Sequence, residues 1–235
     1  MIVKSRRERY RESVSQEIKD VARQQIAAQG AAALSLRAIA NQMEMNVTSL
    51  YNYYKNRDEL VTALLVDAFN SVADVVETAS NSSPTHDYGS PILASLIAYR
   101  EWALAHHAEY ALIAGNPIPG YHAPAEITTR PAQRATFHFL KLLQAAWQHQ
   151  QLNIPSEYVQ LPPNLYRELN EWSYHQELKV PLELIPLALT LWGQLHGLVS
   201  LEINNHTFNI VNDGEALFRF QMLNLLKHLG LPPIS

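Results

Sequence analysis

Apolar residues recur every three to four positions along almost the whole chain, the spacing that places side chains on one face of an α-helix. No segment alternates between apolar and polar residues over a length that predicts a strand. The first apolar series ends at Gly30, and Asn56 to Glu59 have the residue types of an N-cap and a first helical turn. The pattern therefore predicts an all-α protein, with later helices at about 57–80, 91–113, 131–151, 164–178, 181–203 and 214–230.

Between residues 34 and 54 the apolar spacing is divided into two short series. Ser35 can cap a first short helix and Asn46 a second, because both side chains accept hydrogen bonds from backbone N–H groups at helix starts. Ala40 is small enough for the two helices to cross closely. Two short helices joined by a tight turn form a helix-turn-helix, whose second helix enters the major groove of DNA.

The second short helix places hydroxyl, amide and aromatic groups on its outer face, and such groups bond base edges and phosphates. Cations on both sides would neutralise phosphates, and a basic arm from Lys4 to Arg11 extends the positive charge. Tyr54 is interpreted as a core aromatic, one turn from Leu50. The candidate DNA-binding residues are Ser35, Arg37, Val47, Thr48, Ser49, Tyr51, Asn52, Tyr53, Lys55 and Arg57.

The net charge of −4 is unevenly divided along the chain. Residues 1–60 carry ten Lys and Arg against seven Asp and Glu, so their net charge is +3 and that of the remaining residues is −7. A basic N-terminal part on an acidic body suggests that one end meets an anionic partner. A basic tail that only aids solubility is the alternative.

The sequence around the two short helices resembles the DNA-binding domain of the TetR family of transcriptional regulators, over about residues 12–65. The departures from the family pattern are Glu44, where a turn glycine is usual, and Tyr53, Tyr54 and Arg57. The resemblance implies a three-helix DNA-binding domain at 1–62 and a larger all-helical ligand-binding and dimerisation domain at 63–235, connected by the helix at 57–80. The segments that carry it are Ser35-Leu36-Arg37-Ala38-Ile39-Ala40 and Tyr51-Asn52-Tyr53-Tyr54-Lys55-Asn56-Arg57-Asp58-Glu59-Leu60.

The C-terminal body combines aromatic rings with polar groups, as pockets for apolar ligands do, although core packing is the alternative for each ring. Residues 192–198 resemble the Trp-His-Gly motif of one TetR subgroup. In this motif His196 is either a hydrogen-bonded core histidine or a polar ligand contact. The candidate ligand-binding residues are Trp102, Phe137, Trp147, Trp172, Trp192 and His196.

The helices predicted at 181–203 and 214–230 are the most apolar pair. A glycine inside a helix costs roughly 1 kcal/mol relative to alanine, so glycines in the first of these helices predict close approach of another helix. We expect two helices from each subunit to form a four-helix interface in a homodimer, which would require a palindromic operator. The candidate interface residues are Gly193, Gly197, Phe218, Met222 and Leu225.

The composition excludes several classes of site. The chain has no cysteine, which excludes disulfides, thiolate metal sites and a cysteine nucleophile. Its ten histidines include no His-x-x-x-His pair, so no metal and no cofactor is expected. The apolar run at 184–201 contains Gln194 and His196 and is interpreted as a buried helix, because a membrane span needs about 20 apolar residues. No secretory signal is expected at the N-terminus.

The resemblance to the TetR family implies a cytoplasmic bacterial regulator, associated with the nucleoid when bound to double-stranded DNA. The leading hypothesis is a homodimeric repressor released from its operator by a small, largely apolar effector. An enzyme is not expected, because no catalytic base, nucleophile or phosphate loop stands at a characteristic spacing. Two alternatives stay open: an all-helical enzyme whose N-terminal part only resembles a DNA reader, and a protein-interaction role in which Glu44 has cost the helix-turn-helix its DNA affinity.

Overall fold

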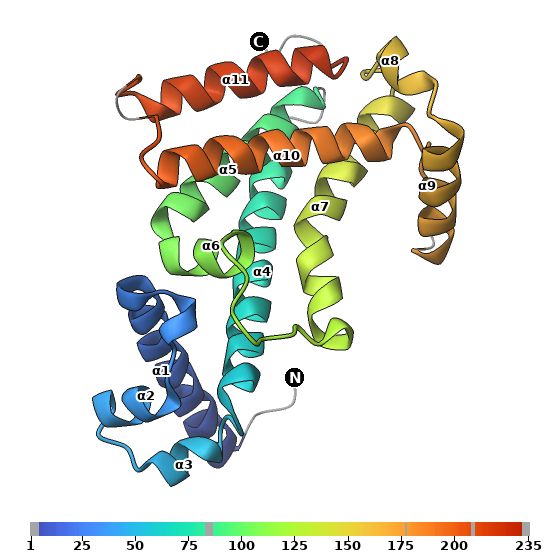
Figure 1. The fold of residues 1–235 in the computed structure, drawn as a ribbon. Coiled ribbons are helices and arrows are strands. Elements are labelled where there is room, and N and C mark those ends of the chain that lie inside the picture. The colour runs from blue at the N-terminus through green and yellow to red at the C-terminus, as the bar shows by residue number, and fades with distance from the viewer. Residues whose placement is uncertain (1–4, 83–86, 177, 208–209, 232–235) are drawn as a thin grey trace. The chain divides into compact units, whose positions relative to one another are not determined.

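The computed structural model describes residues 5–82, 87–176, 178–207 and 210–231. Over these ranges the chain forms α-helices and one short 3₁₀ helix and contains no strand, which confirms the all-α prediction (Figure 1). The elements are α1 (Arg6–Gln29), η1 (Ala31–Ala33), α2 (Leu36–Gln42), α3 (Val47–Tyr51), α4 (Arg57–Asn81), α5 (Gly89–Ala105), α6 (His107–Ala114), α7 (Ala125–Gln148), α8 (Ser156–Val159), α9 (Pro163–His175), α10 (Leu184–Ile203) and α11 (Gly214–His228).

The helices group into two compact units. Unit 1 comprises Met1–Asn70 and His106–Ala132, and unit 2 comprises Ser71–Ala105 and Gln133–Ser235. Unit 1 therefore includes α6 and the start of α7, which follow the first segment of unit 2 in the chain. Packing against the N-terminal helices is a long-range property that the helical periodicity of residues 106–132 does not reveal.

The core of unit 1 is built around α1, whose buried residues recur at helical spacing. A capping box starts this helix: the Glu8 N–H donates to the Ser5 hydroxyl at 3.2 Å, and the Ser5 N–H donates to the Glu8 carboxylate at 2.7 Å. Such boxes satisfy two backbone donors that have no partner within the helix. The fully or almost fully buried side chains of this core include Ile18, Ala22, Ile26, Ile39, Leu50, Leu60 and Leu64.

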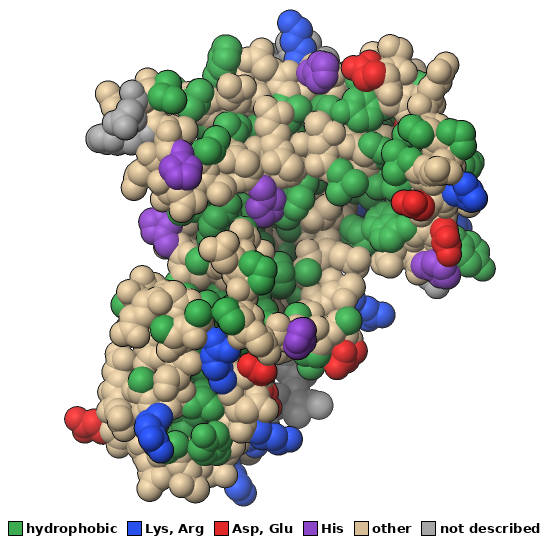
Figure 2. Space-filling model, viewed as in Figure 1, with side chains coloured by type: hydrophobic (Ala, Val, Ile, Leu, Met, Phe, Trp, Pro, Cys, Tyr) green, Lys and Arg blue, Asp and Glu red, His purple; other side chains and the backbone are tan. Residues whose placement is uncertain are grey.

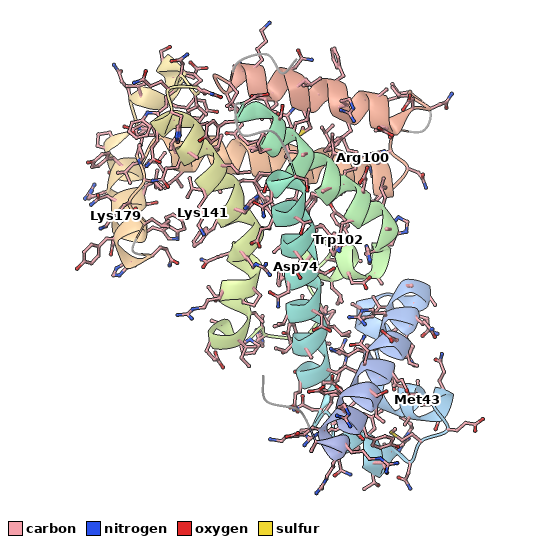
Figure 3. The ribbon with its side chains drawn as sticks, turned by 180° about the vertical axis from the view of Figure 1, so that it is seen from behind. Met43, Asp74, Arg100, Trp102, Lys141 and Lys179 are labelled. Atoms are coloured by element: carbon pink, nitrogen blue, oxygen red, sulfur yellow. The ribbon has the colours of Figure 1, made fainter. Side chains whose placement is uncertain are left out.

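In unit 2, α5 packs against both α10 and α11. Arg100 of α5 is 8% exposed, and its Nε donates to the Glu202 carboxylate of α10 at 2.7 Å (Figure 3). A Cβ on Gly214, the first residue of α11, would lie 2.3 Å from a Glu202 oxygen. A glycine at this position therefore leaves room for the ion pair that joins α5 to α10.

The helix boundaries differ from the prediction by up to three residues at most ends, and by more at two places. The helix expected at 91–113 is broken at His106, whose φ of −128° and ψ of 57° are not helical, so that α5 and α6 are separate. The helix expected to begin at Pro131 begins at Ala125, with Pro131 inside it. Both errors arise because packing, rather than local residue preference, decides where these helices start and stop.

Candidate DNA-binding surface and aromatic site

The connection between α2 and α3 has the geometry of a helix-turn-helix. The Ser35 hydroxyl caps α2 by accepting a hydrogen bond from the Ala38 N–H at 3.4 Å. The Asn46 side chain caps α3 by accepting from the Thr48 N–H at 2.8 Å. Both predicted caps are therefore present. Ala40 is fully buried, as a small residue at a helix crossing should be.

Glu44 occupies the turn between the two helices with a left-handed backbone, φ 52°. The next residue closes the turn, because the Met45 N–H donates to the Ala40 carbonyl at 2.8 Å. A left-handed conformation costs a side chain-bearing residue roughly 1–2 kcal/mol. The turn thus forms without the glycine that is usual in the family pattern, at a cost in stability.

The outer face of α3 and its C-cap point away from the core of unit 1, whereas Leu50 on the inner face is fully buried. Tyr51 is 48% exposed. Val47 and Tyr53, which the sequence also predicts as DNA contacts, are half-buried against the core and offer only part of their surface. The exposed candidates are Thr48, Ser49, Tyr51 and Asn52.

A groove of about 770 Å³ runs between the start of α1 and α3. Arg7 and Arg11 line it from α1, one turn apart, together with the exposed Tyr10. Arg11 Nη2 donates to the Asn52 backbone carbonyl at 3.3 Å, at the end of α3. Lys4, the start of the predicted basic arm, lies outside the described residues. Tyr10 was not predicted, although its position on the same helix face as the two arginines follows from the spacing.

Arg57 has a different environment from the other predicted cations. Its Nε donates to the Leu34 carbonyl at 3.1 Å, and its Nη2 donates to the carbonyls of Ala31 and Ala32 at 3.0 and 3.1 Å. These contacts use the guanidinium to hold η1 against the start of α4.

On the face drawn in Figure 2, most Lys and Arg side chains lie on unit 1. The exposed cations nearest to α3 in the chain are Arg37 and Lys55.

Three of the predicted ligand-binding residues lie in one aromatic cluster of unit 2. The rings of Trp192 and His196, one turn apart on α10, have centroids 4.4 Å apart. Tyr99 of α5 lies 5.5 Å from Trp192 and 5.3 Å from His196, and Trp102 lies 6.3 Å from Tyr99. Phe139 of α7 lies 6.1 Å from Trp192. Tyr99 was not predicted, although it shares a helix face with Trp102, three residues on.

His196 is neutral in this cluster. Burial lowers the pKa of His196 to about 4. The Tyr99 hydroxyl lies 3.1 Å from its Nε2 and 3.3 Å from its Nδ1. A neutral imidazole has one donor and one acceptor nitrogen, so the cluster presents hydrogen-bonding groups among aromatic rings without a net charge.

The other predicted ligand-binding residues lie elsewhere in unit 2. Phe137 of α7 and Trp172 of α9 form an edge-to-face pair with centroids 5.8 Å apart. Trp147, also on α7, is 41% exposed. The six predicted residues thus include three in the Tyr99 cluster, one separate pair and one surface residue.

An exposed apolar stripe runs along α10. Gly193 and Gly197 are exposed, and a Cβ on either would meet no atom within 4 Å. Leu189 and Leu201 continue the four-residue spacing and are 54% and 43% exposed. We call these four residues the α10 stripe. It leaves open space beside two helix glycines, as close approach of another helix would require.

The α11 residues predicted for the same interface have another role. Phe218, Met222 and Leu225 are buried within unit 2, and their helix packs against α5 and α10. Helical periodicity identifies an apolar face but not whether the same chain covers it, which is why these residues were assigned to an interface. The large apolar side chain that α11 does expose is Phe220.

Within the described residues, no group of three or more His, Cys, Asp and Glu is arranged to hold a metal ion. One described helix, Leu184–Ile203, is long and apolar enough by composition to cross a membrane. Its Leu187, Leu191 and Leu195 are fully buried in unit 2, which is the environment of a core helix.

Two family models match the chain. The model described as "Bacterial regulatory proteins, tetR family" matches residues 18–64. The model described as "Tetracyclin repressor-like, C-terminal domain" matches residues 92–225, more than half of the chain. The first match contains the helix-turn-helix, and the second contains the Tyr99 cluster and the α10 stripe.

Among sequence relatives, the HTH-type transcriptional regulator Rv1816 of Mycobacterium tuberculosis strain H37Rv is 39% identical over 135 residues. That alignment covers 57% of this chain and 58% of the length of the relative. A solved structure described as a regulatory protein, SCO4313, is 34% identical with a TM-score of 0.77, over 95% of this chain and all of that one. A bacterial regulatory protein of the tetR family from Rhodococcus RHA1 shares the fold, at 17% identity and a TM-score of 0.63, over 93% of this chain and 97% of that one.

Proposed function

The chain belongs to the TetR family of bacterial transcriptional regulators, and from that membership we propose that it is a dimeric repressor released from a palindromic operator by a small, largely apolar ligand. The names of its relatives indicate a transcriptional regulator, not an enzyme. Its place of action is the bacterial cytoplasm, at the nucleoid when the operator is bound.

The exposed face of α3 is the observation that supports sequence-specific DNA binding. Ser49 and Asn52 line the groove that Arg7 and Arg11 flank from α1, so groups that read bases stand beside groups that neutralise phosphates. The N-cap bond of Asn46 and the Arg11 contact at the other end hold this short helix at both ends. A preorganised helix loses less conformational entropy on binding.

Selection of bound sequences from a random duplex pool tests the proposal. We expect an enriched palindrome with half-sites about one helical turn, or a multiple of it, apart. Affinity for this sequence should fall steeply as salt increases, because phosphate contacts release counterions. If no sequence is enriched at low salt, the proposed operator recognition is wrong.

The α10 stripe supports the proposed dimer. Exposed leucines at the two ends of a pair of helix glycines form an apolar surface with room for a second copy of α10 to pack closely. The exposed Phe220 of α11 provides a further apolar group for such an interface. A two-fold dimer presents two copies of α3, which is the reason to expect a palindrome.

The Tyr99 cluster supports an uncharged aromatic or apolar effector. Its rings offer edge-to-face partners to an apolar or aromatic ligand, and His196, which is hydrogen-bonded to Tyr99, adds no charge to the cluster. Helix α4 contributes residues to both units and is the continuous element through which binding in unit 2 can affect unit 1. By linkage, the operator must weaken effector binding by the same factor as the effector weakens operator binding.

A further inference from the structure

Unit 1 contains a second groove, on a different part of its surface from α3. It lies between the first half of α4 and the segment 121–127, with a volume of about 630 Å³, within the range of small-molecule sites. Figure 1 shows the loop that leads into α7, in light green, beside α4. The lining residues are Tyr54, Asn56, Asp58, Glu59, Thr62, Ala63, Val66, Asp67, Tyr121, His122, Pro124 and Ile127.

Hydrogen bonds within unit 1 hold the two walls of the groove together. The Thr62 hydroxyl donates to the Asp58 carbonyl at 2.8 Å, and the Tyr121 hydroxyl lies 2.9 Å from the same Thr62 oxygen. Since the Thr62 hydroxyl already donates its proton to the Asp58 carbonyl, the Tyr121 hydroxyl is the donor to the Thr62 oxygen. This bond fastens the segment that carries Tyr121 to α4 along one side of the groove.

The walls between these bonds are largely apolar. Ala63 and Val66 of α4 line the groove together with Tyr121 and Pro124, and Ile127, also in the lining, is 51% exposed. Covering such a side chain releases about 25 cal/mol for each Å² of apolar surface removed from water. A ligand with an apolar body is therefore favoured over a fully polar one.

The charged groups that line the groove are acidic. Asp58 and Glu59 are exposed, and Arg57 Nη1 lies 3.8 Å from Asp58. Glu59 accepts a hydrogen bond from the Lys55 backbone N–H at 2.7 Å, which leaves its negative charge in place. Asp67 is paired with Lys19 and Arg23 and contributes less. Among the described residues, no Lys or Arg lines the groove.

We propose that this groove binds a small amphipathic amine, a molecule with one protonated ammonium group and an aromatic or alkyl body. The ammonium group lies by Asp58 and Glu59, and the body lies against Val66, Tyr121 and Ile127. The groove and the Tyr99 cluster belong to different units and favour different ligands, because the cluster presents no charge. This site is independent of the proposed function and does not require an operator or a dimer.

The test uses the full chain and three matched probes: 4-phenylbutylamine, 4-phenylbutan-1-ol and 4-phenylbutanoate. Titration is followed through the ¹³C-methyl signal of Ile127, assigned from its loss in Ile127→Val. We expect the amine to shift this signal saturably, with at least fivefold tighter binding than the alcohol and at least tenfold tighter than the carboxylate. Equal affinity for the three probes, or an amine that leaves the Ile127 signal unmoved, would overturn the proposal.

Variants locate the charge that selects the amine. Asp58→Asn with Glu59→Gln should weaken amine binding at least fivefold and leave alcohol binding unchanged, whereas Glu101→Gln on the exposed surface of unit 2 should change neither. Circular dichroism and the unfolding midpoint confirm that each variant is folded. Trp192→Leu in the Tyr99 cluster should also leave the Ile127 titration unchanged. Loss of the Ile127 titration in Trp192→Leu, with the groove variants binding normally, would place the amine in unit 2 and refute the site.

Discussion

Glu44 shows how one backbone angle affects both stability and DNA binding. Its left-handed φ of 52° is a conformation that glycine adopts freely and glutamate does not. Its carboxylate is also exposed in the turn that leads into α3, so in the proposed complex it would lie near the negative charge of DNA. The two effects have different physical origins, so different substitutions separate them.

Replacing Glu44 by glycine should raise the free energy of unfolding by up to about 1 kcal/mol, because the backbone strain is relieved and only partly offset by the greater freedom of glycine when unfolded. Glu44→Gln keeps the strain and removes the charge, so it should raise DNA affinity at low salt without changing stability. Urea unfolding and a DNA titration at two salt concentrations measure both effects. Equal stability of the glycine and glutamine variants would contradict the strain argument.

The lowered pKa of His196 predicts a pH-dependent stability. Its folded-state pKa is about 4 against 6.5 for an unperturbed histidine, so the unfolded chain binds the proton first as the pH falls. Stability should therefore fall between pH 6.5 and 4, by at most about 3 kcal/mol from this residue. Unfolding measured from pH 7.5 to 4.5 should show a smaller fall in His196→Gln. The control is His175→Gln, at an exposed histidine, which should keep the pH dependence of the parent chain. If His196→Gln also keeps that pH dependence, His196 is not its source.

Local roles of single residues were predictable, and long-range roles were not. Ser35 and Asn46 accept hydrogen bonds from N–H groups two or three residues away, so their residue types at helix starts were sufficient to predict the two caps. Arg57 bonds to carbonyls 23 to 26 residues earlier, in η1 and just after it. Nothing in the residues around Arg57 indicates those acceptors, so its charge alone suggested a phosphate contact.

At the scale of elements, α3 has one face buried in the core of unit 1 and an exposed face that we propose binds DNA. Tyr51→Ala and Asn52→Ala should each weaken binding to the selected operator by about tenfold or more, since a good base contact contributes about 1–3 kcal/mol. The unfolding free energy should change by less than about 0.5 kcal/mol, because both side chains are exposed. Tyr174→Ala, an exposed tyrosine of unit 2, is the matched control for a lost aromatic surface. Equal weakening by the control would argue against specific recognition by α3.

The guanidinium of Arg57 joins η1 to the start of α4. Arg57→Ala leaves three carbonyls without this donor and should lower the free energy of unfolding by about 1–3 kcal/mol. Arg57→Lys should recover only part of the loss, because an ammonium does not span acceptors as a planar guanidinium does. Arg37→Ala, on the exposed side of α2, should stay within about 0.5 kcal/mol of the parent chain. If the alanine variants at 37 and 57 unfold alike, Arg57 has no such positioning role.

Elements were predicted from periodicity, and their partners were not. The apolar spacing of Phe218, Met222 and Leu225 gave the α11 helix and its buried face. The same spacing describes a face covered by a second subunit or by α5 and α10, and the structure shows the latter. The aromatic candidates for ligand binding have different surroundings for the same reason, because spacing does not show what covers a helix face. Trp102 and Trp192 both lie against Tyr99, whereas Trp147 is on the surface.

At the scale of the whole molecule, the proposed dimer depends on the α10 stripe. Leu189→Glu combined with Leu201→Glu places a charge at each end of the stripe and should give a monomer in sedimentation, since unpaired charges are costly to bury in an interface. Both leucines are at least 43% exposed, so the subunit itself should stay folded. Val159→Glu, at another exposed apolar position, should leave the assembly unchanged. A dimer that survives the double substitution would require an interface elsewhere.

The return of α6 to unit 1 has a consequence for how the protein is made. Ala108 and Leu112 of α6 belong to the same core as α1–α3, and Glu109 lies 3.0 Å from Arg23 of α1. These residues leave the ribosome after the first 35 residues of unit 2, Ser71–Ala105, have been synthesised. The DNA-binding part therefore cannot complete its own core as the first product of translation. A truncated gene ending after α4 would encode α1–α3 without the side chains that close that core, so this part is not a detachable module.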